Sequence, residues 1–262
     1  MRIGFRVSYL GSRFFGSQMQ VSSRTVEGEF IAACKRLSLF DDWRKAGFQS
    51  AGRTDRGVHA RGQVIAFTTD TPERAVKTIN FQLPPDIWCT SFSEVPSLFH
   101  PRYDAKSRTY RYYFSEIPGD MGAMEEASQY FLGTHDFSHF ARVGDKNPRR
   151  TILYVHIGEE DGFVFLEVKA ESFLWHQVRC MATALLHVGN GMAGRESITQ
   201  YLLGEIDKPL SPAPAEGLVL WETDCGIMWS ELPEVGPGGT FMVHLIRHHA
   251  LMEKVCRVLR QR

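Results

Sequence analysis

The sequence predicts an α+β fold that is divided into two lobes of similar size. Segments of alternating hydrophobicity, typical of strands, and amphipathic helical segments occur in residues 1–103 and again in residues 104–230. Residues 231–262 show apolar side chains at helical spacing and are expected to form a C-terminal helical extension. The chain has 262 residues, of which 43% are hydrophobic, so it can bury one large core or two smaller ones.

The first lobe is expected to begin with a strand and a helix. Apolar residues alternate with polar or small ones from Ile3 to Tyr9, which predicts a half-buried strand. Thr25 can cap a helix whose apolar residues recur along one face as far as Leu37. The remaining elements predicted in this lobe are a strand at 63–69, a short helix at 73–80 and a strand at 87–92.

The second lobe shows the same kinds of element. Strands are predicted at 110–115, 152–158 and 162–170. Helical spacing of apolar residues predicts a helix from about Phe173 to Gly189 or Gly191. The last segments are a proline-containing loop at 207–217, a strand at 218–221 and an amphipathic helix at 242–259.

Composition and charge argue against several classes of protein. No apolar run approaches the roughly 20 residues needed to cross a bilayer, and the first residues enter an alternating pattern directly, so a cytoplasmic protein is expected. The five cysteines are scattered and odd in number, which argues against disulfides and against a structural zinc. Basic and acidic residues number 30 each, so a nucleic-acid site would have to be a local patch.

The segment 51–64, AGRTDRGVHARGQV, is the one most suggestive of chemistry. It lies between two predicted strands, and its glycines allow tight bends and leave little bulk near Asp55. Arg53, Arg56, His59 and Arg61 supply cations or hydrogen-bond donors that suit phosphates. A glycine-rich loop of mixed charge is also typical of ordinary surface turns, so composition alone does not decide its role.

The full string GRTD-x-GVHA-x-GQV resembles the signature of TruA-type tRNA pseudouridine synthases. Further motifs of that family follow in the family's order and extend the resemblance over most of the chain. They are LPPDI at 83–87, FHPR at 99–102, RTYRY at 108–112, GTHDF at 133–137, RTI at 150–152, FLWHQVR at 173–179 and APAEGL at 213–218.

The resemblance implies a fold and an activity. The fold would be the pseudouridine synthase fold, with two α/β lobes whose antiparallel sheets meet at a central, positively charged cleft. The enzyme would isomerise uridine to pseudouridine in the anticodon stem-loop of tRNA, at positions 38, 39 and/or 40. The family also implies a cytoplasmic homodimer. Because isomerisation changes no oxidation state, no cofactor and no metal are expected, and no phosphate-binding or dinucleotide-binding glycine motif is present.

The resemblance also implies roles for individual residues. Asp55 would be the catalytic nucleophile, although a carboxylate could attack the sugar carbon, attack the pyrimidine ring, or stabilise and deprotonate the detached sugar. Arg179 would be its partner, and Tyr110 would stack on the flipped uracil or take part in removing the C5 proton. Arg53 would hold a phosphate or fill the space left by the base. The other residues expected to bind substrate are His59, Arg61 and Gln63.

The sequence departs from the family at three places, and it leaves other functions open. The tail beyond about Pro233 has no counterpart in the family pattern. The N-terminal stretch 9–18, YLGSRFFGSQ, lacks the acid and the tryptophan of the family pattern, and residue 56 is an arginine where a small residue is usual. A silent RNA-binding protein on the same scaffold is one alternative. A hydrolase using His135 or His139 is another, although sequence neighbours seldom converge on one reacting atom. His244 and His248 are spaced for a metal on one helix but have no evident third ligand.

Overall fold

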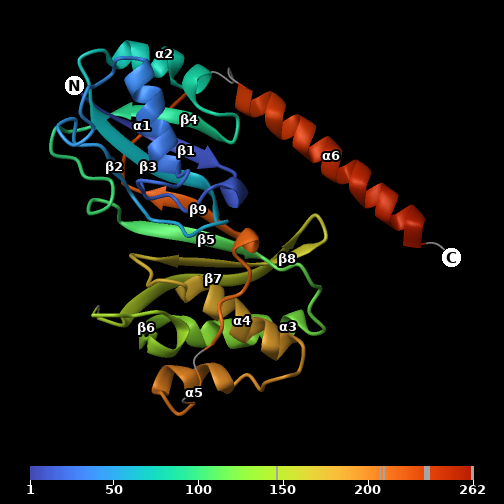
Figure 1. Ribbon diagram of the computed structural model, residues 1–262. Helices are drawn as coiled ribbons and strands as arrows, with labels where there is room; N and C mark the ends of the chain where they lie inside the picture. Colours follow the sequence, from blue (N-terminus) through green and yellow to red (C-terminus); the bar gives the residue numbers. More distant parts are fainter. Residues whose placement is uncertain (146, 207, 209, 233–236, 261–262) are drawn as a thin grey trace.

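The backbone is organised around one ten-stranded sheet in the order β10-β4-β1-β3-β9-β5-β8-β7-β6, with β2 paired to β3 (Figure 1). This computed structural model describes residues 1–145, 147–206, 208, 210–232 and 237–260. The strands are β1 (Arg2–Tyr9), β2 (Gln49–Ser50), β3 (His59–Thr68), β4 (Ile87–Glu94), β5 (Ser107–Tyr113), β6 (Gly133–Asp136), β7 (Arg149–Glu160), β8 (Phe163–Ala170), β9 (Leu218–Asp224) and β10 (Ser230–Glu231). The helices are α1 (Val26–Arg36), α2 (Pro72–Gln82), α3 (Met121–Ser128), α4 (Gln177–Gly189), α5 (Ser197–Leu203) and α6 (Pro237–Arg260). The α+β fold class is confirmed.

The two halves of the sheet join at a short parallel pairing between β3 and β9. His59 lies opposite Val219 and Ala60 opposite Leu220, whereas every other pairing among the described strands is antiparallel. The backbones approach so closely here that a Cβ on Gly62 would lie 2.6 Å from the Trp221 carbonyl oxygen. The antiparallel sheets of the two halves are therefore continuous. The start of β3, where the loop that contains Asp55 ends, lies beside the C-terminal half.

The N-terminal half is built on β1 and β3, with α1 and α2 lying against the same face (Figure 1). Phe5 of β1 stacks on Phe67 of β3, and Phe30 of α1 packs against both rings. Helix α1 begins where predicted, because the side chain of Thr25 accepts a hydrogen bond from the Gly28 amide. The predicted elements of this half are confirmed, with ends that differ by a few residues.

In the C-terminal half, α4 begins later than predicted. Residues 173–176 are not helical: the Leu174 amide donates to the side-chain oxygen of Gln177, and His176 has a positive φ of 69° before α4 begins. The prediction of a helix from Phe173 is wrong for these four residues because apolar spacing does not register a local side-chain bond that competes with the helix. As a result Trp175 and His176 precede the helix and face the N-terminal half.

Helix α6 confirms the predicted C-terminal helix and projects away from the two halves (Figure 1). Before it, β10 pairs with β4, so the chain returns to the N-terminal half. Gly238 is buried against the Trp88 ring at the base of α6, whereas every described side chain from Ile246 to Arg260 is exposed. Within the described residues, no helix has the length and apolar character needed to cross a membrane. The expected extension 231–262 includes residues 233–236 and 261–262, which lie outside the described residues.

Candidate active site

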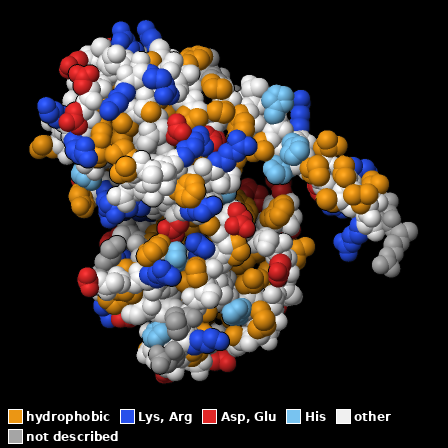
Figure 2. All heavy atoms as spheres, viewed as in Figure 1, with side chains coloured by type: hydrophobic (Ala, Val, Ile, Leu, Met, Phe, Trp, Pro, Cys, Tyr) orange, Lys and Arg blue, Asp and Glu red, His pale blue; other side chains and the backbone are white. Residues whose placement is uncertain are grey.

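A cavity of about 720 Å³ lies where the two halves meet. Its wall combines the loop after Ala51, the segment after Gly11, the start of β5 and the residues that precede α4. A smaller cavity of about 60 Å³ adjoins it and reaches Arg179. On the face seen in Figure 2, Lys and Arg side chains are intermixed with Asp and Glu, in agreement with the net charge of zero.

The loop that carries Asp55 is held in place by the residue before it. Thr54 is buried; its amide donates to the Ser17 hydroxyl at 2.8 Å, and its hydroxyl lies 2.8 Å from the buried Tyr9 hydroxyl. The Ser17 amide donates in return to the Thr54 carbonyl at 3.0 Å. These contacts leave little freedom to the backbone at residue 55.

Gln63 and Gly57 complete the support of this loop. Gln63 is 1% exposed, and its side-chain amide both accepts from the Gly52 amide at 3.1 Å and donates to the Gly52 carbonyl at 2.8 Å. Gly57 has a φ of +85°, a backbone conformation that residues with a Cβ rarely adopt. Gln63 thus lies behind the loop and does not line either of the two cavities.

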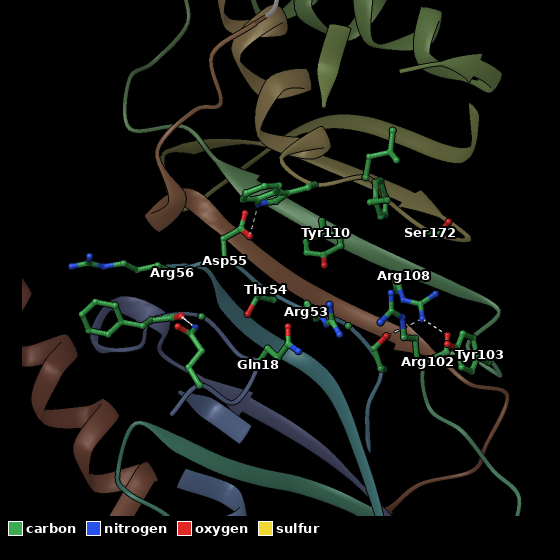
Figure 3. Close-up of a pocket in the computed structure, with 18 residues that line it drawn as sticks. Gln18, Arg53, Thr54, Asp55, Arg56, Arg102, Tyr103, Arg108, Tyr110 and Ser172 are labelled. Atoms are coloured by element: carbon green, nitrogen blue, oxygen red, sulfur yellow. Dashed lines mark hydrogen bonds between the residues drawn. The ribbon is translucent and has the colours of Figure 1, made fainter. Parts of the chain in front are cut away.

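Three side chains from the C-terminal half bring a nitrogen atom close to the Asp55 carboxylate, and Figure 3 marks one of these contacts, the hydrogen bond to Asp55, with a dashed line. The Trp175 indole Nε1 donates to Oδ1 at 2.9 Å. The other oxygen, Oδ2, lies 3.4 Å from His176 Nε2 and 3.7 Å from Arg179 Nη1. The Asp55 side chain is 34% exposed, so it is reachable from the cavity while it faces a cation. The predicted Asp55–Arg179 juxtaposition is therefore present in the structure.

Tyr110 of β5 points into the same space as Asp55 (Figure 3). Its ring meets Phe173 edge-on, with centroids 5.2 Å apart, and the residue is buried. Burial raises the pKa of the Tyr110 hydroxyl to about 12, with the Asp55 charge adding to the effect and Arg108 opposing it. Tyr110 is therefore a neutral phenol at neutral pH.

Four arginines surround the larger cavity, and they divide into two kinds. Arg108 is buried and donates to the carbonyls of Ala51, Arg102 and Glu171, so its guanidinium joins the two halves. Arg53, Arg56 and Arg102 are exposed, and none of them forms an ion pair within the part of the chain that the structure describes. These three are free to meet an anionic ligand.

A family model described as tRNA pseudouridine synthase matches residues 6–104 and 127–224, which is more than half of the chain. The chain belongs to the tRNA pseudouridine synthase family. It is 55% identical over 261 residues to tRNA pseudouridine synthase A of Methanoculleus marisnigri, covering 100% of this chain and 96% of that relative. It is 54% identical to the same-named protein of Methanosphaerula palustris over 88% of this chain and 82% of that relative, and 42% identical to that of Thermococcus onnurineus over 84% of each.

The resemblance to TruA-type enzymes is therefore confirmed, and with it the pseudouridine synthase fold. As a member of the family, this synthase is an isomerase that converts uridine to pseudouridine in tRNA. The cavity beside Asp55 is lined by residues of both matched stretches.

Two residues expected to bind substrate lie elsewhere in the synthase. His59 Nδ1 accepts from the Gly11 amide at 3.0 Å, and burial lowers the pKa of the imidazole. The Arg61 guanidinium lies 4.3 Å from the centroid of the Trp221 ring. Neither residue lines the two cavities, whereas Arg53, Asp55 and Tyr110 line both, and Arg179 lines the smaller one.

Sequence reasoning gave no role to Trp175, His176 or Phe15. Trp175 and His176 lie within the FLWHQVR motif, which marks this segment as part of the family signature. The motif does not indicate that these two side chains lie close to Asp55. Phe15 lies in the stretch that departs from the family pattern, and Arg56 covers its ring at 4.4 Å. The unusual arginine at position 56 therefore has an aromatic partner at the edge of the cavity.

The residues of the alternative functions are placed differently. The His135 ring nitrogen bonds the Leu132 carbonyl at 2.7 Å, and the Ser138 hydroxyl bonds Asp136, so these groups are engaged locally. Phe137 and Phe140 are fully buried, which accounts for the motif structurally. In the described residues, no three His, Cys, Asp or Glu side chains lie close enough together to hold a metal ion.

Proposed function

We propose that this synthase acts in the cytoplasm on uridines 38, 39 and/or 40 of the tRNA anticodon stem-loop, with Asp55 as its nucleophile. The observation that carries the proposal is the Asp55 carboxylate, which lies at the wall of a cavity large enough for a nucleotide and faces Arg179. Arg179 brings a positive charge to 3.7 Å from this carboxylate, and Asp and Glu carboxylates act as nucleophiles in enzymes.

The chemistry needs no change of oxidation state. The N1–C1′ bond of uridine breaks, the uracil turns, and a C5–C1′ bond forms; C5 loses a proton and N1 gains one. Among the described residues, Asp55 Oδ2 has no partner within the usual hydrogen-bond distance, so it is free to attack the sugar carbon or the ring, or to stabilise and deprotonate the detached sugar. Each route keeps the two fragments in one cavity while the base turns.

The cavity wall suits a nucleotide that has left its helix. Tyr110 offers a ring to the uracil, and a base stacked on an aromatic side chain gains about 1–3 kcal/mol. Arg53 and Arg102 are exposed and unpaired among the described residues, so they can meet the flanking phosphates or fill the place of the flipped base. Both line the larger cavity, which supports this assignment.

Mapping of pseudouridine in a tRNA transcript tests this proposal. The transcript carries uridine at 38, 39 and 40, and the purified protein is added without nucleotide or redox cofactor. We expect pseudouridine at one or more of these positions and none elsewhere in the transcript. Transcripts with cytidine at each position in turn assign the sites. Pseudouridine confined to another arm of the tRNA would contradict the proposed specificity.

We also propose that the protein is a homodimer and that α6 contributes to the contact. The helix is about 36 Å long at 1.5 Å per residue and leaves its apolar side chains exposed from Ile246 onward, whereas Met242 and Leu245 are half-buried. One stripe has the alternating three- and four-residue spacing of paired helices. Its members are Met242, Leu245, His249, Met252, Cys256 and Leu259. Such a spacing fits α6 of a second copy of the protein, packed stripe against stripe.

Replacing Met252 and Leu259 together by Glu is expected to convert the dimer to a monomer, because two charges would then be buried at the helix contact. Sedimentation equilibrium measures the mass. Lys254→Glu, on the opposite side of α6, is the matched control and should remain dimeric. A wild-type protein that is monomeric at micromolar concentration, or a double variant that stays dimeric, would exclude this contact.

A further inference from the structure

The segment 173–179 supplies several of the contacts at Asp55, and they differ in length. The Trp175 indole lies at hydrogen-bond distance from Oδ1, 2.9 Å, whereas Arg179 is 3.7 Å from Oδ2. Hydrogen bonds between nitrogen and oxygen fall between about 2.7 and 3.2 Å. Of these two groups, only the indole therefore restrains the orientation of the carboxylate directly.

His176 is a weaker candidate for the same task. Its Nε2 lies 3.4 Å from Oδ2, beyond good hydrogen-bond length. Burial lowers the pKa of the imidazole, and the charges of Arg179 and Arg142 act in the same direction, although Asp55 opposes them. The ring is therefore mostly neutral at pH 7, and it adds little charge to the site.

Trp175 is itself held by the backbone of its own half. The Arg142 amide donates to the Trp175 carbonyl at 2.9 Å as an isolated antiparallel bridge, and the Arg142 guanidinium lies 5.0 Å from the centroid of the Trp175 ring. The residue is nevertheless 49% exposed, and it lines both cavities. An indole fixed at its base and open on one side can hold a carboxylate without closing the cavity.

We propose that Trp175 is a positioning residue of the reaction: its indole N–H engages Oδ1 of Asp55 across the junction of the two halves and leaves Oδ2 free to act on the uridine. The inference rests on the proposed role of Asp55. The free oxygen then faces Arg179, which itself donates to the Ala213 carbonyl. Without the indole, the carboxylate can turn away from this orientation, so fewer bound uridines meet one of its oxygens in a reactive geometry.

Trp175→Phe removes the N–H and keeps an aromatic ring, whereas Trp175→Leu removes both. We expect the single-turnover rate of pseudouridine formation to fall on the order of 10- to 100-fold in each variant, as the loss of a hydrogen bond to a charged group predicts. The affinity for tRNA, measured separately, should change less than about threefold, because the indole binds the enzyme's own carboxylate. Trp43→Phe, at a site away from both cavities, is the matched control and should match wild type.

Nuclear magnetic resonance of the tryptophan indole protons tests the contact without any activity. The protein has five tryptophans, and the Trp175 signal is the one missing from Trp175→Phe. In Asp55→Ala this signal should move upfield while the other four stay in place, because only Trp175 loses its acceptor. A role limited to packing would leave it unmoved.

A Trp175→Phe variant that turns over at the wild-type rate, or an indole signal indifferent to Asp55→Ala, would overturn the inference. A Phe variant of normal rate beside a Leu variant of weakened tRNA affinity would show Trp175 to be a stacking platform instead. If the proposed function itself is wrong, the result differs. Either the wild-type protein would form no pseudouridine at the proposed positions, or Asp55→Asn would form it near the wild-type rate.

Discussion

Tyr110→Phe should bind tRNA almost normally and lose on the order of 100-fold or more in single-turnover rate, within the range for groups that act in proton transfer. The change deletes one hydroxyl and keeps the ring, which remains edge-on to Phe173. The measurement is release of label from C5 of the target uridine with enzyme in excess. Tyr110→Leu should lose affinity as well, by about the 1–3 kcal/mol of a base stack.

The pH dependence separates the two possible roles of Tyr110, stacking by its ring and proton transfer by its hydroxyl. The pKa of Tyr110 is raised to about 12 by burial, so the phenol is protonated at neutral pH and its charged fraction rises with pH. If the phenolate takes the C5 proton, label release should increase about tenfold per pH unit from about pH 7 to 9. The Phe variant should show no such rise. A Phe variant with wild-type release would confine Tyr110 to stacking.

Much of the fold follows from local patterns in the sequence. The alternation from Ile3 to Tyr9 and the cap at Thr25 predicted β1 and α1, because both depend on neighbouring residues. Elements with weak local signals were not predicted. They are α3, α5, β2, β6 and β10. The two-residue strands exist only because a longer partner strand lies beside them.

The joining of the halves could not be read from the sequence. Strand β9 lies between β3 and β5, and its pairing with β3 brings together His59 and Val219, which are distant along the chain. No periodic pattern specifies such a neighbour. The close approach at Gly62 is visible only once β9 is in place.

The family motifs predicted part of the site. Asp55 and Tyr110 share a cavity and Arg179 lies close to Asp55, as the family motifs suggested, and their roles in catalysis stay predictions. His59 and Gln63 belong to the same loop motif, but their side chains bond backbone groups that shape the loop. A motif preserves residues that support a site together with those that act in it, and only the structure separates them.

The central claim is that the Asp55 carboxylate acts on the uridine, and Asp55→Asn tests it most directly. The substitution removes charge and nucleophilicity and keeps the size of the side chain, and the amide oxygen can still accept from Trp175. Thr54 and Ser17, which hold the loop, are unchanged. The loop should therefore keep its shape and the variant its affinity for tRNA.

The measurement is pseudouridine formed in a single turnover of saturating enzyme on the same tRNA transcript, with tRNA affinity measured in parallel for both proteins. We predict that Asp55→Asn loses at least roughly 1,000-fold in rate, as is found when a nucleophile is removed, while its tRNA affinity stays within a few-fold of wild type. Pseudouridine formation by Asp55→Asn near the wild-type rate would contradict the account.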